Sequence, residues 1–121
     1  EFFYGIFIKE KKIGNNKLNI VHVGNIKIGP INYLHEHAAI SYLVGEKKFW
    51  RKGIASIAIK MVVKIAKKRF SLKKILSYVH EKNIASTKVL FNNNFILEAK
   101  LKRKIKYKNK RVDELIFSKF I

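Results

Sequence analysis

The residues from Phe49 to Ser56 combine basic and small side chains directly before a segment with helical periodicity, in the order Phe49-Trp50-Arg51-Lys52-Gly53-Ile54-Ala55-Ser56. Backbone N–H groups at the start of a helix lack intrahelical partners and lie at the positive end of the helix dipole, so they can donate to an anion. Gly53 permits close backbone approach, and Arg51 and Lys52 add charge. This pattern predicts a phosphate-binding turn. It is a weak signal by itself, and it is neither a Walker loop nor a dinucleotide fingerprint.

Side chains that could transfer a proton are sparse. The loop His35-Glu36-His37 and Glu46 hold the titratable groups nearest to the predicted central strand, and a histidine can act near neutral pH. Any one of them can equally be a solvated loop residue. The sequence has no cysteine, which excludes a disulfide framework and a thiolate nucleophile, and its four histidines show no metal-ligand spacing. We therefore expect no metal site.

The formal net charge of +19 is large for 121 residues and attracts anions of many kinds, including nucleic acids and phosphorylated small molecules. The lysines are spread over the whole chain, which favours solvated faces over a dedicated nucleic-acid surface. No apolar run is long enough to span a bilayer, and the start lacks a signal-peptide pattern. We expect a cytoplasmic protein.

The elements that would position these residues alternate between strands and helices. Residues 2–9 and 18–28 are β-rich and predict an antiparallel hairpin, with Gly29-Pro30 ending its second strand. The apolar run Ala38 to Val44 predicts a central strand. From Gly53 to Phe70 the pattern is helical, with an apolar stripe formed by Ile54, Ala58, Met61, Val62, Ile65 and Ala66. The strand Ile75 to Val79 follows, which completes a β-α-β unit.

The last third of the chain predicts a second helix and a hairpin. The helix begins near Asn83, a good N-cap residue, and ends around Asn92-Asn93-Asn94. The hairpin closes the chain after an alternating strand whose predicted apolar face holds Leu97, Ala99, Leu101, Ile105 and Tyr107. The predicted fold is α/β (α+β), one domain over residues 1–121, with a mixed, mostly antiparallel sheet. Because Glu1 leads straight into a strand, we expect an N-terminally truncated domain.

Two segments resemble the signatures of a known superfamily. Ile40-Ser41-Tyr42-Leu43-Val44-Gly45-Glu46-Lys47-Lys48-Phe49-Trp50-Arg51-Lys52-Gly53-Ile54-Ala55 is similar to the coenzyme A motif of the GNAT N-acetyltransferases. Asn83-Ile84-Ala85-Ser86-Thr87-Lys88-Val89-Leu90, ending in Asn94-Phe95, resembles their second signature. The resemblance is strongest to the branch that acetylates ribosomal-protein N-termini. It covers the chain from Phe2 onward and lacks the family's first strand and the two helices after it.

The resemblance implies that acetyl-CoA is the cosubstrate and assigns residues to it. The backbone of Arg51, Lys52, Gly53, Ile54, Ala55 and Ser56 would bind the pyrophosphate. The edge of the strand Ser41-Tyr42-Leu43-Val44 would pair with the pantetheine arm and leave the thioester in a splay beside the strand Ile75 to Val79. Asn83 and Ser86 would face the same cleft. Ser86 would donate to the departing thiolate, although a hydroxyl in the first turn of a helix can equally satisfy backbone N–H groups.

Departures from the family pattern leave the general base unassigned. Acids are missing at Ala39 and in the stretch 101–105, and the usual tyrosine of the second helix is Leu90. The candidate catalytic residues are therefore Ser86, Tyr42 and His37. The predicted reaction is acetyl transfer to a primary amine, either a protein N-terminus or the amine of a nucleotide-linked sugar, with a homodimer as a possible assembly and no membrane or nucleic-acid partner expected. The alternatives are an inactive coenzyme A-binding relative and a basic nucleic-acid-binding module.

Overall fold

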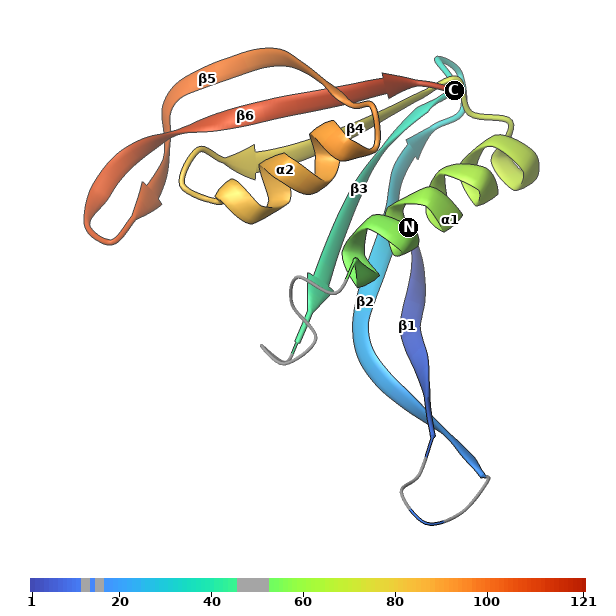
Figure 1. Cartoon of the computed structure of the whole chain (residues 1–121). Coiled ribbons are helices and arrows are strands. Elements are labelled where there is room, and N and C mark those ends of the chain that lie inside the picture. The colour runs from blue at the N-terminus through green and yellow to red at the C-terminus, as the bar shows by residue number, and fades with distance from the viewer. Residues whose placement is uncertain (12–13, 15–16, 46–52) are drawn as a thin grey trace.

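The computed structural model describes residues 1–11, 14, 17–45 and 53–121 of the chain. These residues form a six-stranded sheet and two helices (Figure 1). In chain order the elements are β1 (Phe2–Lys11), β2 (Leu18–Asn32), β3 (His37–Val44), α1 (Ile54–Phe70), β4 (Lys74–His80), α2 (Ile84–Asn92), β5 (Ile96–Tyr107) and β6 (Lys110–Phe120).

The strand order is β1-β2-β3-β4-β6-β5. All neighbouring strands are antiparallel except β3 and β4, which are parallel and are connected through α1. This arrangement confirms the predicted mixed, mostly antiparallel sheet, its β-α-β unit and its C-terminal hairpin.

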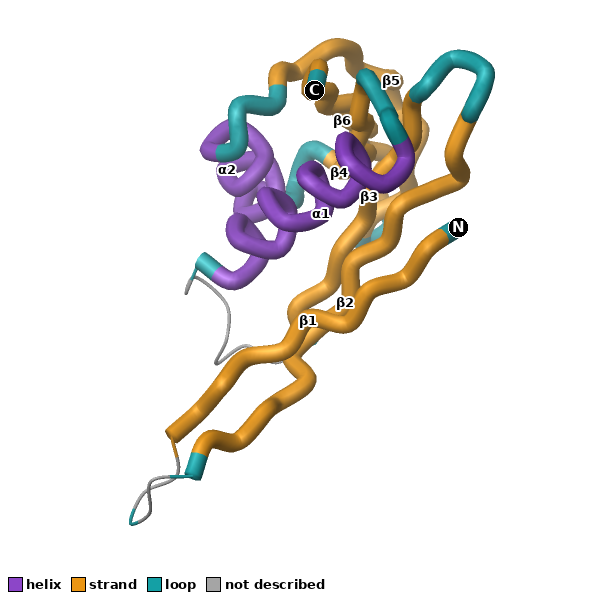
Figure 2. Tube along the Cα trace, turned by 90° about the vertical axis from the view of Figure 1, so that its right-hand side faces the viewer, coloured by secondary structure: helices purple, strands orange, loops and turns teal. Residues whose placement is uncertain are grey.

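Both helices cover the same face of the sheet, and the opposite face carries no helix among the described residues (Figure 2). The core lies under the helices, where Ile28, Ile59, Ile75, Leu90 and Phe117 are fully buried. Exclusion of these side chains from water is the main stabilising contribution to such a domain. The helices are therefore held against the sheet by burial of apolar area.

The predicted apolar stripe of α1 is correct in part. Ala58, Val62 and Ala66 are buried as expected, together with Ile59, which the prediction omitted. The prediction is wrong for Met61, because this residue is 60% exposed. Residues spaced by three or four along a helix share one face, and the buried set is centred on Ala58 and Val62, which leaves Met61 at the margin of that face.

The prediction that Gly29-Pro30 ends the second strand is wrong. β2 continues to Asn32, and its register with β3 shifts between Ile28 and Ile31. Because Ile28 lies opposite Ile40 and Ile31 opposite Ala38, two residues of β2 oppose one residue of β3. A bulge of this kind tolerates a proline inside a strand, since the ladder needs no donor there.

The predicted apolar face of β5 is also corrected by bulges. Leu97 lies opposite Phe117 and Ala99 opposite Ile116, so a register shift places these two residues on different faces. A second shift lies between Leu101 and Ile105. Arg103, within it, has a left-handed φ of 54°. The one extra residue of the first shift reverses the alternation of side chains along β5, whereas the two extra residues of the second shift preserve it. The sequence pattern alone did not reveal either shift.

None of the helices formed by the described residues is long and apolar enough to cross a membrane. Over the same residues, no group of three or more His, Asp or Glu side chains is arranged to hold a metal ion.

Candidate active site

The two parallel strands at the centre of the sheet separate soon after they pair. β3 and β4 are in register only from His37 to Ala39 and from Lys74 to Leu76. Beyond that point β3 stays with β2 up to Val44, while β4 stays with β6 up to His80. The described parts of the two strands therefore diverge around a V-shaped opening, along which β3 and β4 are not paired with each other.

Ser77 lies at the narrow end of this opening. Its side chain is 3% exposed, and its hydroxyl donates to the carbonyl oxygen of Ile40 at 3.4 Å, across the gap. The carbonyl of Ile40 thus points toward β4. Because backbone direction alternates along a strand, the N–H and C=O of Tyr42 also point toward the opening, whereas those of Ser41 and Leu43 point toward β2.

The first turn of α2 lies beside the same opening. Asn83 caps the helix, as predicted, and its side-chain oxygen accepts from the backbone N–H of Ser86 at 3.1 Å. This bond fixes the first turn and directs the Ser86 hydroxyl. Tyr42 of β3 then donates from its hydroxyl to Ser86 Oγ at 3.0 Å. Two predicted catalytic residues that are 44 positions apart in sequence are therefore in direct contact.

The environment of Tyr42 keeps its phenol protonated. Burial raises the pKa of Tyr42 above its ordinary value of 10.0, and the hydrogen bond with Ser86 offsets only part of this increase. Tyr42 thus acts as a hydrogen-bond donor to Ser86 over the physiological pH range. With its oxygen occupied in this way, the Ser86 hydroxyl is free to direct its own hydrogen to a third group.

The N-terminus of α1 has the features of an anion-binding helix end. Gly53 precedes the helix with a left-handed φ of 74°, and among the described residues, its chain neighbours aside, no atom lies within 4 Å of the position of a Cβ there. No described side chain caps this end, and the first turn of α1 has no acidic residue. The N–H groups of Ile54, Ala55 and Ser56 therefore lie at the positive end of the dipole. Arg51 and Lys52, the basic part of the predicted turn, lie outside the described residues.

A buried asparagine joins the two helices at this place. Asn93 is 3% exposed, and its Nδ2 donates both to Ser56 Oγ and to the carbonyl oxygen of Val89, each at 2.9 Å. Ser56, whose backbone is predicted to bind the pyrophosphate, thus uses its hydroxyl oxygen as an acceptor for Asn93 at the end of α2. The sequence predicts only the end of a helix from the asparagines 92–94. Their signal for a tertiary role is weak, because any polar residue can end a helix.

His37 is not brought together with the Tyr42–Ser86 pair. It begins β3 at the end that pairs with β4, and five residues of extended chain separate it from Tyr42 by about 16 Å. Glu46, the other acid considered, lies outside the described residues.

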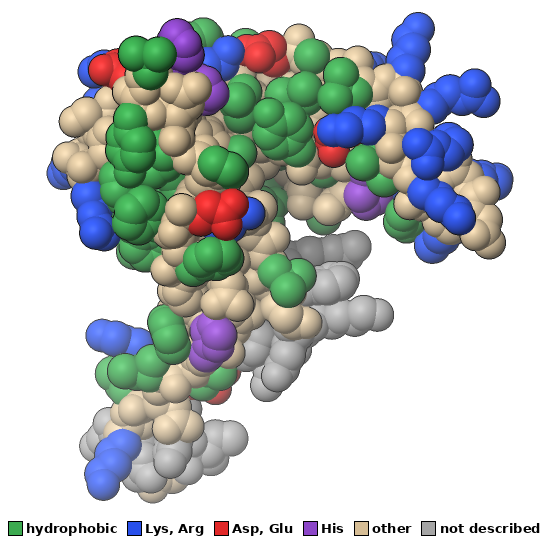
Figure 3. Space-filling model, turned by 180° about the vertical axis from the view of Figure 1, so that it is seen from behind, with side chains coloured by type: hydrophobic (Ala, Val, Ile, Leu, Met, Phe, Trp, Pro, Cys, Tyr) green, Lys and Arg blue, Asp and Glu red, His purple; other side chains and the backbone are tan. Residues whose placement is uncertain are grey.

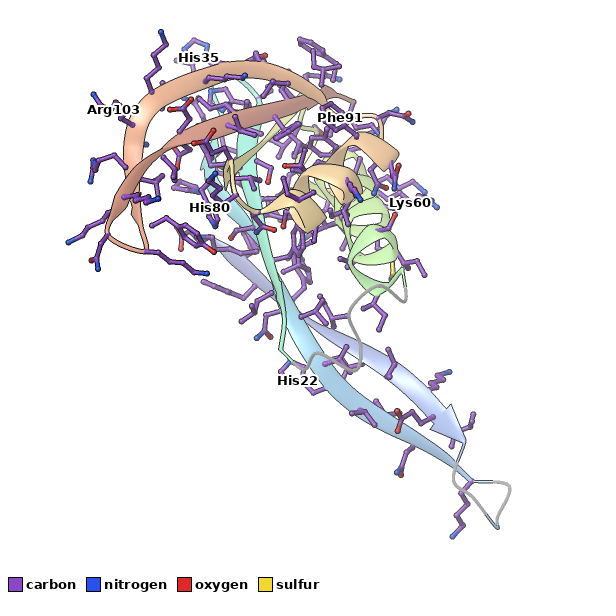
Figure 4. The ribbon with its side chains drawn as sticks, turned by 60° about the vertical axis from the view of Figure 1, so that its left-hand side comes forward. His22, His35, Lys60, His80, Phe91 and Arg103 are labelled. Carbon is purple, nitrogen blue, oxygen red and sulfur yellow. The ribbon has the colours of Figure 1, made fainter. Side chains whose placement is uncertain are left out.

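A different histidine, His80, occupies the end of β4. Its ring stacks on that of Tyr107 with centroids 4.8 Å apart, and its buried Nδ1 has no hydrogen-bond partner among the described residues. In Figure 4, His80 lies within the curve of the β5–β6 hairpin, whereas Arg103 points outward from it. Nothing in the residue pattern distinguishes His80 from the other three histidines.

An apolar groove of about 320 Å³ lies elsewhere, between α1 and β1, with Phe7, Ile57 and Met61 among its lining residues. It contains neither Tyr42 nor Ser86. We assign the chemistry to the V-shaped opening rather than to this groove, because among the described residues the opening brings the backbone groups of Tyr42 together with the hydroxyls of Tyr42 and Ser86.

Comparison with known proteins agrees with this geometry. The family model for the acetyltransferase (GNAT) domain matches residues 2–96. The chain belongs to the GNAT acetyltransferase family. No curated protein matches the sequence.

Solved structures share the GNAT fold at low sequence identity. A probable acetyltransferase superposes with a TM-score of 0.76 at 21% identity, over 83% of this chain and 55% of that protein. The dodecameric spermidine N-acetyltransferase from Vibrio cholerae gives 0.77 at 19%, over 83% and 58%. The spermidine/spermine N-acetyltransferase from the same organism in complex with manganese ions gives 0.74 at 19%, over 87% and 59%. The GNAT chain described here thus spans less than two thirds of the length of each.

The described residues of this GNAT domain fit a coenzyme A thioester. The α1 N-terminus offers donors and open space at Gly53 for a phosphate group. The opening between β3 and β4 offers strand edges to an extended, amide-containing arm, as an added strand would use them. The Ser86 hydroxyl lies beside that opening and completes a set of donors for phosphate, amide and sulfur.

Proposed function

We propose that this domain transfers the acetyl group of acetyl-CoA to a primary amine. The observation that carries the proposal is the opening between β3 and β4. The N-terminus of α1 lies next to β3, which forms one side of the opening (Figure 1), and the Tyr42–Ser86 hydrogen bond of 3.0 Å joins β3 to α2 next to the same opening. One elongated ligand with a phosphate at one end and a thioester at the other fits these features together.

The residues of the chain would hold this ligand at three points. Backbone N–H groups of Ile54, Ala55 and Ser56 would donate to the pyrophosphate, supported by Arg51, Lys52 and Gly53. The β3 edge predicted from Ser41, Leu43 and Val44 would pair with the pantetheine arm. The direction of the Ile40 carbonyl indicates that the backbone of Tyr42 contributes to this pairing more directly than that of Ser41 or Leu43.

Bound acetyl-CoA supplies an electrophilic carbonyl carbon attached to a thiolate leaving group. A free amine attacks this carbon with its lone pair, a C–N bond forms, the C–S bond breaks, and the proton lost by the nitrogen passes to solvent. Ser86 donates a hydrogen bond to the sulfur, where negative charge develops, and Tyr42 positions Ser86 through the hydrogen bond that it donates. No base has been assigned, so we propose that the amine is deprotonated by solvent before it attacks.

We propose that the acceptor is a protein N-terminus of the ribosomal-protein type, or the amine of a nucleotide-linked sugar, rather than a polyamine. The two Vibrio cholerae neighbours carry spermidine or spermidine/spermine in their names. A polyamine is polycationic, and a chain with a net charge of +19 repels it at long range. An acidic protein surface or a nucleoside diphosphate is instead attracted by the same charge.

Calorimetric titration with acetyl-CoA, followed by a thiol-release assay with three acceptors, tests the proposal. The acceptors are spermidine, a peptide with a free N-terminus and a nucleoside-diphosphate amino sugar. We expect binding of acetyl-CoA, and faster thiol release with one of the two latter acceptors than with spermidine. Absence of heat with acetyl-CoA would overturn the proposal, whereas binding without release to any acceptor would identify an inactive relative.

A further inference from the structure

The β5–β6 hairpin has a concentration of charge that the composition of the chain does not explain. Eight of the twelve residues from 100 to 111 are lysine or arginine, against 27 in the whole chain of 121. Lysines and arginines spread evenly over the chain would give about a third of that density. All eight residues are exposed, and they are Lys100, Lys102, Arg103, Lys104, Lys106, Lys108, Lys110 and Arg111.

Few of these charges are neutralised within the described residues. Lys104 pairs with Glu114 at 2.7 Å. Asp113 accepts the backbone N–H of Arg103 at 2.9 Å, and the guanidinium of Arg111 donates to the carbonyl oxygens of Arg103 and Lys104. The side chains of Lys100, Lys102, Lys106 and Lys110 extend into solvent with no acidic partner among the described residues.

The cations lie on both faces of the hairpin. Lys100 lies opposite Leu115 and Lys106 opposite Arg111, so these side chains share the face that carries the helices. Lys110 lies opposite Tyr107, on the face where Tyr107 stacks against His80. Figure 3 shows Lys and Arg side chains gathered over the projecting end of the molecule that this hairpin forms. A binding site for a single small anion would need them on one face only.

The hairpin is a preorganised arm. In the bulge from Leu101 to Ile105, three residues oppose Asp113 alone, and the left-handed backbone of Arg103 is held by hydrogen bonds from Arg111 and to Asp113. Fixing a bend in advance lowers the entropy lost when a surface binds its partner. The described cations are therefore presented in a defined arrangement rather than on a disordered tail.

We propose that the β5–β6 hairpin binds the phosphate backbone of a nucleic acid duplex, as a function additional to acetyl transfer. A two-stranded β-ribbon fits a duplex groove, and cations on both of its faces can contact the phosphates on either side of that groove. The one aromatic ring near its tip, Tyr107, is already stacked on His80. Recognition is thus electrostatic and independent of sequence, because stacking on single-stranded bases would need free aromatic rings.

Fluorescence anisotropy with a labelled 20-base-pair duplex of mixed sequence, measured over a salt series, tests this proposal. The variant Lys102→Gln/Lys106→Gln/Lys110→Gln removes three exposed cations from the hairpin. The matched control Lys64→Gln/Lys67→Gln/Lys68→Gln removes three exposed cations from α1 and lowers the net charge equally. A third variant with arginine at positions 102, 106 and 110 keeps the charge of the hairpin.

We expect the hairpin glutamine variant to bind the duplex about 10- to 100-fold more weakly at 0.1 M salt, with a log–log salt slope shallower by about 2.7. The α1 control should change affinity less than about threefold, and the arginine variant should bind as the unmodified chain does. Acetyl-CoA binding should be equal in all four proteins, which separates this proposal from the proposed enzymatic function.

Three results would overturn the proposal. The first is absence of duplex binding by the unmodified chain, and the second is an equal loss of affinity in the α1 control, which would indicate general charge attraction. The third is tighter binding of a glutamate-rich peptide than of the duplex, with this peptide binding lost in the hairpin glutamine variant. That result would assign the surface to an acidic protein.

Discussion

Tyr42 donates a hydrogen bond of 3.0 Å to Ser86, and this contact joins the central strand β3 to the first turn of α2. Two hydrogen bonds together fix the direction of the serine hydroxyl. Its oxygen accepts from a phenol whose pKa is raised by burial, and its backbone N–H is held by the Asn83 side chain. The hydroxyl hydrogen is therefore the part of Ser86 that is left to interact with a ligand.

Removal of the serine hydroxyl should slow acetyl transfer more than it weakens cosubstrate binding. For Ser86→Ala we expect kcat to fall by about 10- to 100-fold, because one donor to a developing negative charge is lost. For Tyr42→Phe we expect a smaller decrease, of about threefold to tenfold, since Tyr42 acts through Ser86. Steady-state kinetics with saturating acetyl-CoA measures both effects, and calorimetry should give a Kd within about threefold of the unmodified value.

The double variant decides whether the two hydroxyls act as one unit. If Tyr42 only positions Ser86, Ser86→Ala/Tyr42→Phe should have the same kcat as Ser86→Ala alone, because coupled groups are not additive. Independent contributions that multiply would contradict the positioning role. A rate for Ser86→Ala equal to that of the unmodified enzyme would remove Ser86 from the mechanism.

The helix end at Gly53 offers a test in which stability and binding should change in opposite directions. Asparagine and aspartate both tolerate a left-handed backbone, and the space beside Gly53 is open, so both substitutions should be accommodated. Gly53→Asp adds a negative charge that stabilises the helix dipole by about 0.3–1 kcal/mol relative to Gly53→Asn. The same charge repels a phosphate at the Ile54 to Ser56 N–H groups.

We therefore expect the aspartate variant to unfold at a higher temperature than the asparagine variant, yet to bind acetyl-CoA at least about tenfold more weakly. Thermal denaturation and calorimetry on the two proteins provide the comparison. Equal acetyl-CoA affinities would mean that the pyrophosphate is held away from this helix end.

The sequence was sufficient to predict features that depend on local chemistry. The cap at Asn83 follows from side-chain hydrogen bonding. The end of the helix near Asn94, whose φ is 64°, follows from the tolerance of asparagine for a left-handed backbone. The helix from Ile54 to Phe70 follows from its apolar periodicity. Each of these signals lies within a few residues of the feature it specifies.

Features that depend on distant partners could not be predicted from the residue pattern alone, and the splay between the central strands was expected only from the family resemblance. The separation of β3 from β4 leaves no mark on the apolar pattern of either strand, because each keeps a partner on its other side. The bulge around Arg103 depends on Asp113 and Arg111 from the next strand. The Tyr42–Ser86 contact was not foreseen as a pair, although both residues were singled out individually.

The buried side chain of Asn93 should be important for stability and for the position of the α1 N-terminus. Asn93→Ala removes donors to Ser56 Oγ and to the Val89 carbonyl, and we expect it to lower the free energy of unfolding by about 1–3 kcal/mol. Urea denaturation measures this loss. Asn19→Ala, at an exposed position of β2, serves as the control and should stay within about 0.5 kcal/mol.

Acetyl-CoA affinity separates the two roles of Asn93. If the bond to Ser56 positions the helix end, Asn93→Ala should weaken acetyl-CoA binding under conditions where the variant is fully folded, and Ser56→Ala should do so to a similar extent. A folded Asn93→Ala protein with unchanged affinity would restrict this residue to a structural role.

Glu98 should make stability depend on pH in the acid range. Its carboxylate accepts from Lys74 at 2.6 Å and from Ser118 at 2.9 Å, and these bonds, that of Lys74 foremost, lower the pKa of Glu98 below its ordinary value of 4.5. In the window between the lowered and the ordinary pKa the unfolded chain binds more protons than the folded one. The contribution of Glu98 is therefore fully present above the ordinary pKa and is lost as the pH falls through the lowered one.

Glu98→Gln removes the titrating group and should flatten the dependence of unfolding free energy on pH below 4.5, while the unmodified protein loses stability there. Urea denaturation from pH 3 to pH 7 gives both curves. Lys74→Met tests whether Lys74 lowers the pKa of Glu98. This substitution removes the cation but keeps a long apolar side chain that can pack on the Phe120 ring, whose centroid lies 5.2 Å from Lys74 Nζ. If the Lys74→Met curve remains as steep as that of the unmodified protein, Lys74 is not what lowers the pKa of Glu98, and the ion pair makes no contribution to acid stability.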